Sequence, residues 1–166
     1  MKKIIKTLLL FSAFLLLFGC NKEKEERRHP GDVILEDIKY SLDQEDTAYN
    51  IKYKVAKNFK KTVLSNAVNY FSEKKDGESY FVIRILYYPN KDINYAVKDS
   101  VTEYDNKYEK TIKDVDYTVV HFKNSVGNAE TNIYYHTHNK NTYAFVFTSG
   151  IDISALEKKF LQRVEY

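Results

Sequence analysis

Hydrophobic positions in residues 32–166 follow a period of two over most of their length. Val, Ile, Thr and Tyr alternate with polar residues in short runs, which is typical of half-buried strands. The pattern predicts seven strands, at residues 33–42, 49–55, 66–73, 79–88, 117–123, 131–138 and 142–148.

Short links containing turn residues join several of these predicted strands. Asp76-Gly77 separates the third strand from the fourth and is a favoured pair for a type I′ hairpin turn. Gly127-Asn128 links the fifth strand to the sixth, and Asn139-Lys140-Asn141 links the sixth to the seventh. Parallel neighbours would need a longer crossover, so these strands are expected to be antiparallel.

Two segments have the spacing of amphipathic helices instead. The first follows Asp92, a suitable N-cap, and has apolar residues at Ile93, Ala96, Val97, Val101, Tyr104 and Tyr108. The second begins near Asp152 or Ser154 and is expected to bury Leu156, Phe160, Leu161 and Val164. Residues 81–86 are apolar on both faces, which indicates a sheet covered on both sides. The pattern therefore predicts an α+β fold, with a central antiparallel sheet of about six or seven strands flanked by two helices.

The first twenty residues have a different character. Lys2, Lys3 and Lys6 precede an uncharged run that ends at Gly19 and Cys20. This run is shorter than the roughly 20 apolar residues of a transmembrane helix and has the form of a secretory signal. Residues 17–20, Leu-Phe-Gly-Cys, resemble the lipobox of bacterial lipoproteins. The resemblance implies that residues 1–19 are removed and that Cys20 carries diacylglycerol and an acyl chain such as palmitate.

Residues 20–31 are polar and end in Pro30-Gly31, as expected of a flexible tether between lipid and domain. Docking of their charges to lipid headgroups is the alternative. Residues 32–166 form the single expected domain, placed in the cell envelope on the extracytoplasmic face of the cell membrane. Cys20 is the only cysteine, so no intramolecular disulfide can form.

The charge balance argues against a nucleic-acid partner. The chain has 26 basic and 23 acidic residues, and loss of the three lysines of the signal leaves 23 of each sign. A net charge near zero provides no electrostatic footprint for a polyanion. The expected partners are the lipid bilayer, through Cys20, and a protein.

The order of elements resembles the PsbP-like fold. The similar segments are residues 53–59 (Tyr-Lys-Val-Ala-Lys-Asn-Phe), the helix after Tyr88-Pro89, and residues 143–147 leading into the last helix. The resemblance implies a sandwich of sheet and helices and a role in protein binding or assembly without catalysis. No cofactor is expected apart from the covalent lipid on Cys20.

His136-Thr137-His138 is the strongest candidate for a metal site. Residues two apart in a strand point to the same face, so both imidazoles could bind one zinc or copper ion. His121 joins them if it lies opposite Tyr134 in the preceding hairpin. The alternative is that these histidines lie at the solvated end of a hairpin.

Tyrosine is unusually frequent, with 15 Tyr and no Trp. Tyr87, Tyr88 and Tyr134 are candidates for a protein interface or, less favoured, a sugar-binding surface. The alternative is that they are ordinary half-buried strand residues.

No catalytic residue is expected. Ser65, Ser125 and Ser149 lack the Gly-x-Ser-x-Gly context of a serine nucleophile. An envelope hydrolase would need paired acids, and the candidates are Glu103, Asp105, Glu109, Asp114 and Asp116. Such acids also commonly form a solvated surface. The preferred hypothesis is a membrane-anchored lipoprotein that binds or assembles proteins, with a metal-binding lipoprotein and an envelope hydrolase as alternatives.

Overall fold

The computed structural model describes residues 42–73, 79–123, 129–150 and 152–166, which all belong to one compact unit, Gly31–Tyr166. The predicted signal peptide, the predicted lipidation site Cys20 and the predicted tether lie outside the described residues. So do the turns at Asp76-Gly77 and Gly127-Asn128, and all of the predicted strand 33–42 except Leu42.

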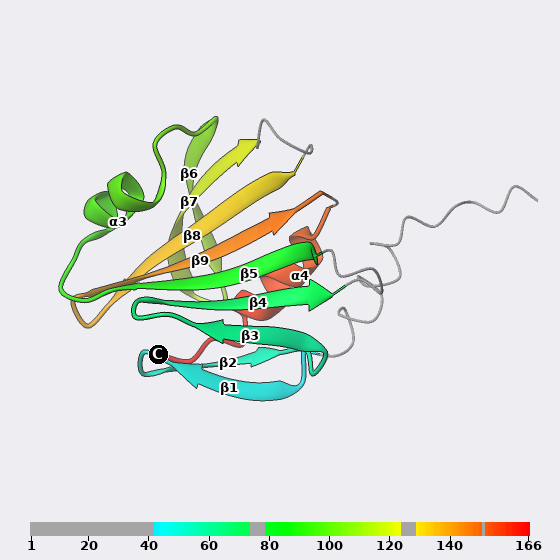
Figure 1. Cartoon of the computed structure of the whole chain (residues 1–166). Helices are drawn as coiled ribbons and strands as arrows, with labels where there is room; N and C mark the ends of the chain where they lie inside the picture. Colours follow the sequence, from blue (N-terminus) through cyan, green and yellow to red (C-terminus); the bar gives the residue numbers. More distant parts are fainter. Residues whose placement is uncertain (1–41, 74–78, 124–128, 151) are drawn as a thin grey trace, which may run out of the picture. The chain divides into compact units, whose positions relative to one another are not determined.

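Seven strands form one antiparallel sheet, in the order β3-β4-β5-β9-β8-β7-β6 (Figure 1). From one edge to the other they are β3 (Phe59–Val63), β4 (Ala67–Glu73), β5 (Ser79–Tyr88), β9 (Asn141–Ser149), β8 (Glu130–His138), β7 (Val115–Lys123) and β6 (Asn106–Ile112). Two further strands, β1 (Gln44–Ala48) and β2 (Ile51–Val55), form a separate antiparallel hairpin. The predicted α+β class is confirmed.

The turn between β8 and β9 confirms the antiparallel pairing expected there. His138 pairs with Asn141, so only Asn139 and Lys140 lie between the strands. Their φ angles of 48° and 66° are left-handed, which is the geometry that matches the twist of a two-residue hairpin. Tyr49 and Asn50 have the same left-handed geometry between β1 and β2.

The first helix is shorter than predicted. Helix α3 (Ile93–Ser100) begins after Asp92, whose side chain accepts a hydrogen bond from the Tyr95 backbone N–H at 2.8 Å, as the N-cap prediction requires. The expectation that its apolar stripe continues to Tyr108 is wrong, because Tyr108 lies in β6 opposite Val119. Tyr104 and Tyr108 are four residues apart, and that spacing fits one face of a strand as well as one face of a helix.

One face of the sheet is covered by helix α4 (Ser154–Leu161) and by the β1–β2 hairpin. Phe160 lies at the centre of this layer, with ring centroids 5.8 Å from Tyr53 and 5.6 Å from Phe147. Leu156, Phe160 and Leu161 of α4 are buried as expected, and so is Val164, which follows the end of the helix.

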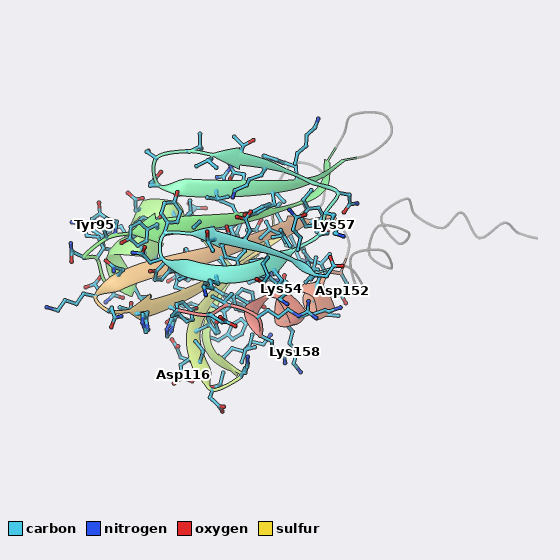
Figure 2. The ribbon with its side chains drawn as sticks, turned by 90° about the horizontal axis from the view of Figure 1, so that it is seen from below. Lys54, Lys57, Tyr95, Asp116, Asp152 and Lys158 are labelled. Carbon is cyan, nitrogen blue, oxygen red and sulfur yellow. The ribbon has the colours of Figure 1, made fainter. Side chains whose placement is uncertain are left out.

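The opposite face carries α3, which packs Ala96 and Val97 against a second cluster that includes Tyr135 and Ala144. This helix lies over one end of the strands only (Figure 1). In the view of Figure 2, Tyr95 of α3 is at one end of the domain and Lys57 is at the other. No helix within the described ranges is long and apolar enough to cross a membrane.

Candidate functional site

Five aromatic side chains form a row on the α4 face of the sheet. Tyr87 of β5 is opposite Tyr143 of β9, and Tyr143 is opposite His136 of β8. The row continues to Tyr117 of β7, whose ring centroid is 5.7 Å from that of His136. Tyr166 lies against it, 4.6 Å from the His136 ring. The His136 imidazole is therefore packed among tyrosines.

The two histidines of the predicted metal site do share one face of β8, with ring centroids 6.4 Å apart. The Nδ1 of His136 lies 3.0 Å from the carbonyl oxygen of Asp116. A carbonyl can only accept, so Nδ1 carries the proton and Nε2 keeps its lone pair. Burial lowers the pKa of His136, and this favours the neutral imidazole that a metal ion needs. The Nε2 of His138 accepts a hydrogen bond from the Asn139 amide at 2.8 Å.

His121 is on the same face of the sheet but lies at a different position along the strands. It pairs with Asn132 instead of the expected Tyr134, and its Nδ1 lies 2.9 Å from the Asn132 Oδ1. His136 is four residues further along β8 than Asn132, a separation of about 13 Å. The structure therefore does not bring His121 to the other two histidines. In the part of the chain that is described, no group of three or more His, Cys, Asp and Glu side chains could hold a metal ion.

The tyrosines considered for a protein interface belong mainly to the core. Tyr88 and Tyr134 are 6% and 1% exposed, so their rings cannot contact a partner. Tyr87 is half-buried and stacks on Tyr49, with ring centroids 4.8 Å apart. These positions fit the alternative of strand tyrosines that pack the domain.

Glu157 of α4 is a buried carboxylate that the sequence analysis missed. It is 2% exposed and accepts hydrogen bonds from the Tyr134 hydroxyl at 2.6 Å and from the Asn132 amide at 2.9 Å. Burial raises the pKa of Tyr134, and the nearby Glu157 charge raises it further. Glu157 lies four residues after Ile153 and three before Phe160, which is helical spacing. Its place in this apolar stripe could have been used to predict its burial.

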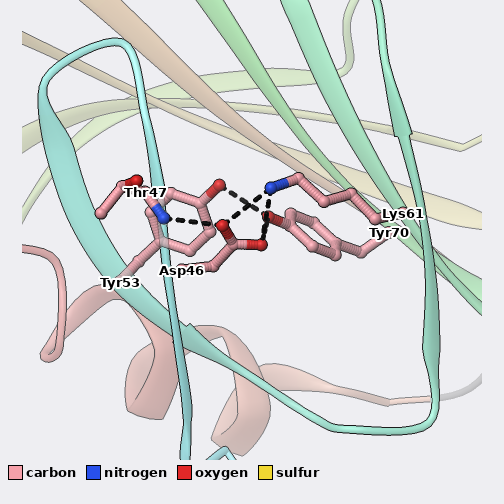
Figure 3. Close-up of polar contacts among 5 residues, drawn as sticks. All are labelled: Asp46, Thr47, Tyr53, Lys61 and Tyr70. Carbon is pink, nitrogen blue, oxygen red and sulfur yellow. Dashed lines mark hydrogen bonds and ion pairs between the residues drawn. The ribbon is translucent and has the colours of Figure 1, made fainter.

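Asp46 of β1 links the hairpin to the main sheet (Figure 3). Lys61 Nζ lies 2.7 and 2.8 Å from its two carboxylate oxygens, and the Tyr70 hydroxyl donates to Oδ2 at 2.7 Å. Burial opposes the charged form, but hydrogen bonds from Lys61, Tyr70 and the Thr47 backbone N–H outweigh it and lower the pKa of Asp46. Burial also raises the pKa of Tyr53, which bonds to Tyr70, to about 12.

Several acids considered for hydrolysis are bound to structural partners. Glu109 accepts a hydrogen bond from the Thr118 hydroxyl at 2.9 Å, and Asp116 accepts one from the Thr111 hydroxyl at 2.6 Å. Asp105 accepts one from a backbone N–H of β7 at 3.0 Å. Each of these carboxylates fixes a neighbouring strand or loop.

The α3 face of the sheet has an uncovered region beyond the helix. We define it as the open sheet face: Phe71 of β4, Val82, Arg84 and Leu86 of β5, and Val146 of β9. The four apolar members are partly exposed, and Arg84 is exposed. Leu86 and Val146 pack on one side against the buried cluster beneath α3, whereas Phe71, Val82 and Arg84 belong to neither buried cluster of the described residues. Helix α3 lies over one end of the strands (Figure 1).

Arg84 is at the centre of this face. It is opposite Asn69 on one side and Val146 on the other, and Val82 and Leu86 flank it along β5. Its Nε donates to the Oδ1 of Asn69 at 2.6 Å, and Asn69 is 4% exposed. The base of the guanidinium is thus held by a buried amide. Its four terminal N–H donors have no partner among the described residues.

A scan of family models finds no match to the chain, and a search of curated proteins finds none either. Among solved structures, a crystal structure of a protein from Bacteroides thetaiotaomicron VPI-5482 is similar, with a TM-score of 0.50 and 11% identity over 69% of this chain. The chain spans 44% of that protein's length. At this identity the likeness shows a shared fold and nothing about function.

Proposed function

We propose that the protein is a lipid-anchored, non-catalytic module that binds a partner protein at the extracytoplasmic face of the cell membrane. The observation that carries this proposal is the open sheet face. Apolar side chains around an exposed arginine are a composition typical of protein interfaces. Arg84 and Val146 lie side by side in neighbouring strands. Arg84 can provide a polar contact to a partner, and Val146 can provide an apolar one.

The anchor supports the same proposal. Cys20 follows a basic and apolar leader, and acylation there would hold the domain at the bilayer surface. Two molecules confined to one surface meet at a high effective concentration, so a small interface is enough for a functional complex.

The PsbP-like resemblance also favours partner binding. The resemblance is one of sequence pattern: it rests on residues 53–59, on the helix after Tyr88-Pro89 and on residues 143–147 before the last helix. That fold is associated with protein binding and assembly, which we extend to this chain as part of the proposal.

Site-specific photo-crosslinking in cells tests the proposal. A photoreactive residue at Val82 or Val146 should crosslink to a discrete protein, because both side chains lie on the open sheet face. The same residue at Lys54, on the outer side of β2, is the control and should not form that product. A Cys20→Ser chain, which cannot be acylated, should lose the product. Absence of any protein crosslink from both positions of the open face contradicts the proposal.

A second candidate is a divalent-metal site at His136 and His138. The hydrogen bond from His136 Nδ1 to the Asp116 carbonyl favours it, because such a bond orients a metal-ligating imidazole and leaves Nε2 free. Zinc and copper suit imidazole ligands.

Titration of the full chain with Zn²⁺ or Cu²⁺, followed by histidine NMR, tests this candidate. The His136→Ala/His138→Ala variant should lose binding, while the matched His121→Ala variant should retain it because His121 lies at a different level of the sheet. Equal binding by wild type and the double variant would exclude the site.

A further inference from the structure

We infer that the open sheet face binds an amphipathic helix of the partner protein and that a carboxylate on this helix pairs with Arg84. The inference rests on the proposed binding function and adds the chemistry of the partner. It follows from three features of the described residues: the partly exposed apolar side chains of this face, the guanidinium at their centre, whose terminal N–H groups have no acceptor there, and the helix packed beside them.

A helix fits the shape of the uncovered region. The inner side of α3 shows how this face is covered, since Ala96 and Val97 pack on β8 and β9. A helix laid beside α3 would complete the layer, as helices commonly do on an antiparallel sheet. Val82 and Leu86 are four residues apart on β5, about 13 Å, and this distance matches two to three turns of a helix.

Arg84 determines the charge of the partner. Covering its free N–H donors with apolar groups alone would cost desolvation energy without compensation. A carboxylate can accept two parallel hydrogen bonds from one guanidinium, which fixes its geometry as well as its charge. The residues adjacent to Arg84 are Asn69, Val82, Leu86 and Val146, none of them acidic. The missing acceptor is therefore assigned to the partner.

Two other occupants fit less well. A symmetric pair of copies meeting through this face would bring two Arg84 guanidinium groups together near the symmetry axis, where their like charges repel. A flat bilayer would be held away from the sheet, because α3 beside the open face adds a layer about 10 Å thick. The positive charge of Arg84 and the height of α3 beside this face thus favour an amphipathic helix with a carboxylate in its apolar face.

Peptide probes test the inference on the full acylated chain in nanodiscs of neutral lipid. One probe is an amphipathic helix of roughly 18 residues, long enough to form a stable helix, with a single Glu in its apolar face. The matched probe carries Gln at that position. The Glu peptide should bind at least about tenfold more tightly, because it forms a charge-assisted hydrogen bond with Arg84. Empty nanodiscs measure any binding to lipid.

Variants of the protein complete the double-mutant cycle. Arg84→Gln should bring the affinity for the Glu peptide down to that for the Gln peptide. Arg84→Lys should keep part of the difference, because it retains the charge but loses the planar fork. Lys52→Gln removes one exposed positive charge from β2, away from the open sheet face, and should leave both affinities unchanged. Thermal unfolding of each variant checks that the domain remains folded.

The outcomes separate this inference from the proposed function. If Val82 and Val146 crosslink to a protein but the Glu and Gln peptides bind equally, the acidic-helix inference is overturned and the binding function stands. Crosslinks that join only lipid, or only a second copy of the chain, overturn both. A protein crosslink together with a preference for Glu that depends on Arg84 supports both.

Discussion

The Tyr134 hydroxyl on β8 donates a 2.6 Å hydrogen bond to the Glu157 carboxylate on α4, inside the core. Asn132, two residues before Tyr134, donates to the other carboxylate oxygen. The bonds fix α4 to the sheet through a group that has almost no access to water. The helix position therefore depends on a polar pair as well as on Phe160 and Leu161.

Replacement of Tyr134 by Phe should lower the free energy of unfolding by about 1.5–3 kcal/mol, because one buried carboxylate oxygen loses its donor. Urea unfolding, followed by far-UV circular dichroism, measures the change. The matched variant Tyr108→Phe removes the hydroxyl of a 44% exposed tyrosine and should change stability by less than about 0.5 kcal/mol. Equal effects of the two substitutions would show that the Glu157 bond contributes nothing specific.

The Asp46 network predicts a loss of stability in acid. The pKa of Asp46 is lower in the folded chain than in the unfolded chain, where it is about 3.9. The folded state therefore binds fewer protons, and its advantage is full above pH 3.9 and declines as the pH falls toward the folded pKa. Urea unfolding at steps from about pH 6 to pH 2 should show this decline.

The Asp46→Asn variant is the test of this assignment. It should be less stable than wild type at neutral pH and should have a flatter stability profile below about pH 4. The exposed Asp43→Asn variant should keep the wild-type profile. An unchanged acid dependence in Asp46→Asn would assign the effect to other carboxylates.

The central strands could be predicted because burial leaves a pattern in the sequence. β5 has the predicted bounds, Ser79–Tyr88. Ile83 and Ile85 are buried on its α4 face, and Tyr88 is buried on the opposite face, in the cluster that includes α3. β8 begins one residue earlier than predicted, and β9 extends one residue further than predicted at each end. Each of these strands lies inside the sheet with a neighbouring strand on both sides. Its buried residues therefore form an alternating or a continuous apolar pattern in the sequence.

The edge strands could not be predicted in the same way. In β3 every side chain after Phe59 is exposed, and in β6 every side chain before Ile112 is exposed. Their hydrogen bonds to β4 and β7 hold them in the sheet, and exposed lysines such as Lys60 and Lys107 are common at sheet edges. An exposed strand of this kind has no hydrophobic period.

The candidate sites show the same limit. The shared face of His136 and His138 follows from their spacing, but the level of His121 depends on the register of β7 against β8. The Asp46 link joins β1, β3 and β4, two of which have no hydrophobic pattern. Arg84 stands out in the sequence because it interrupts an otherwise apolar strand. Its exposure could not be predicted, because it depends on how much of this sheet face α3 covers.

The cap of α3 provides a local test of helix formation. Asp92→Ala removes the acceptor for the Tyr95 backbone N–H and should destabilise the domain by about 1 kcal/mol. Asp92→Ser keeps an N-cap oxygen and should restore most of that loss. Hydrogen exchange at the amides of Tyr95 and Ala96 should be faster in the alanine variant. Exchange that is unchanged in Asp92→Ala would mean that packing of Val97 alone sets the start of the helix.

The lipid anchor can be tested by the mass of the mature chain. If Cys20 lies in a lipobox, the wild-type protein begins at Cys20 and carries diacylglycerol, because the lipid is added before the signal is cut. The Cys20→Ser chain should keep residues 1–19 and incorporate no labelled palmitate, since serine has no thiol to acylate. Intact-mass spectrometry and palmitate labelling give both results.

Ser12→Ala, a change within the apolar run, should be processed like wild type. An unmodified wild-type chain that retains residues 1–19 would remove the anchor, and with it the local concentration on which the binding proposal depends.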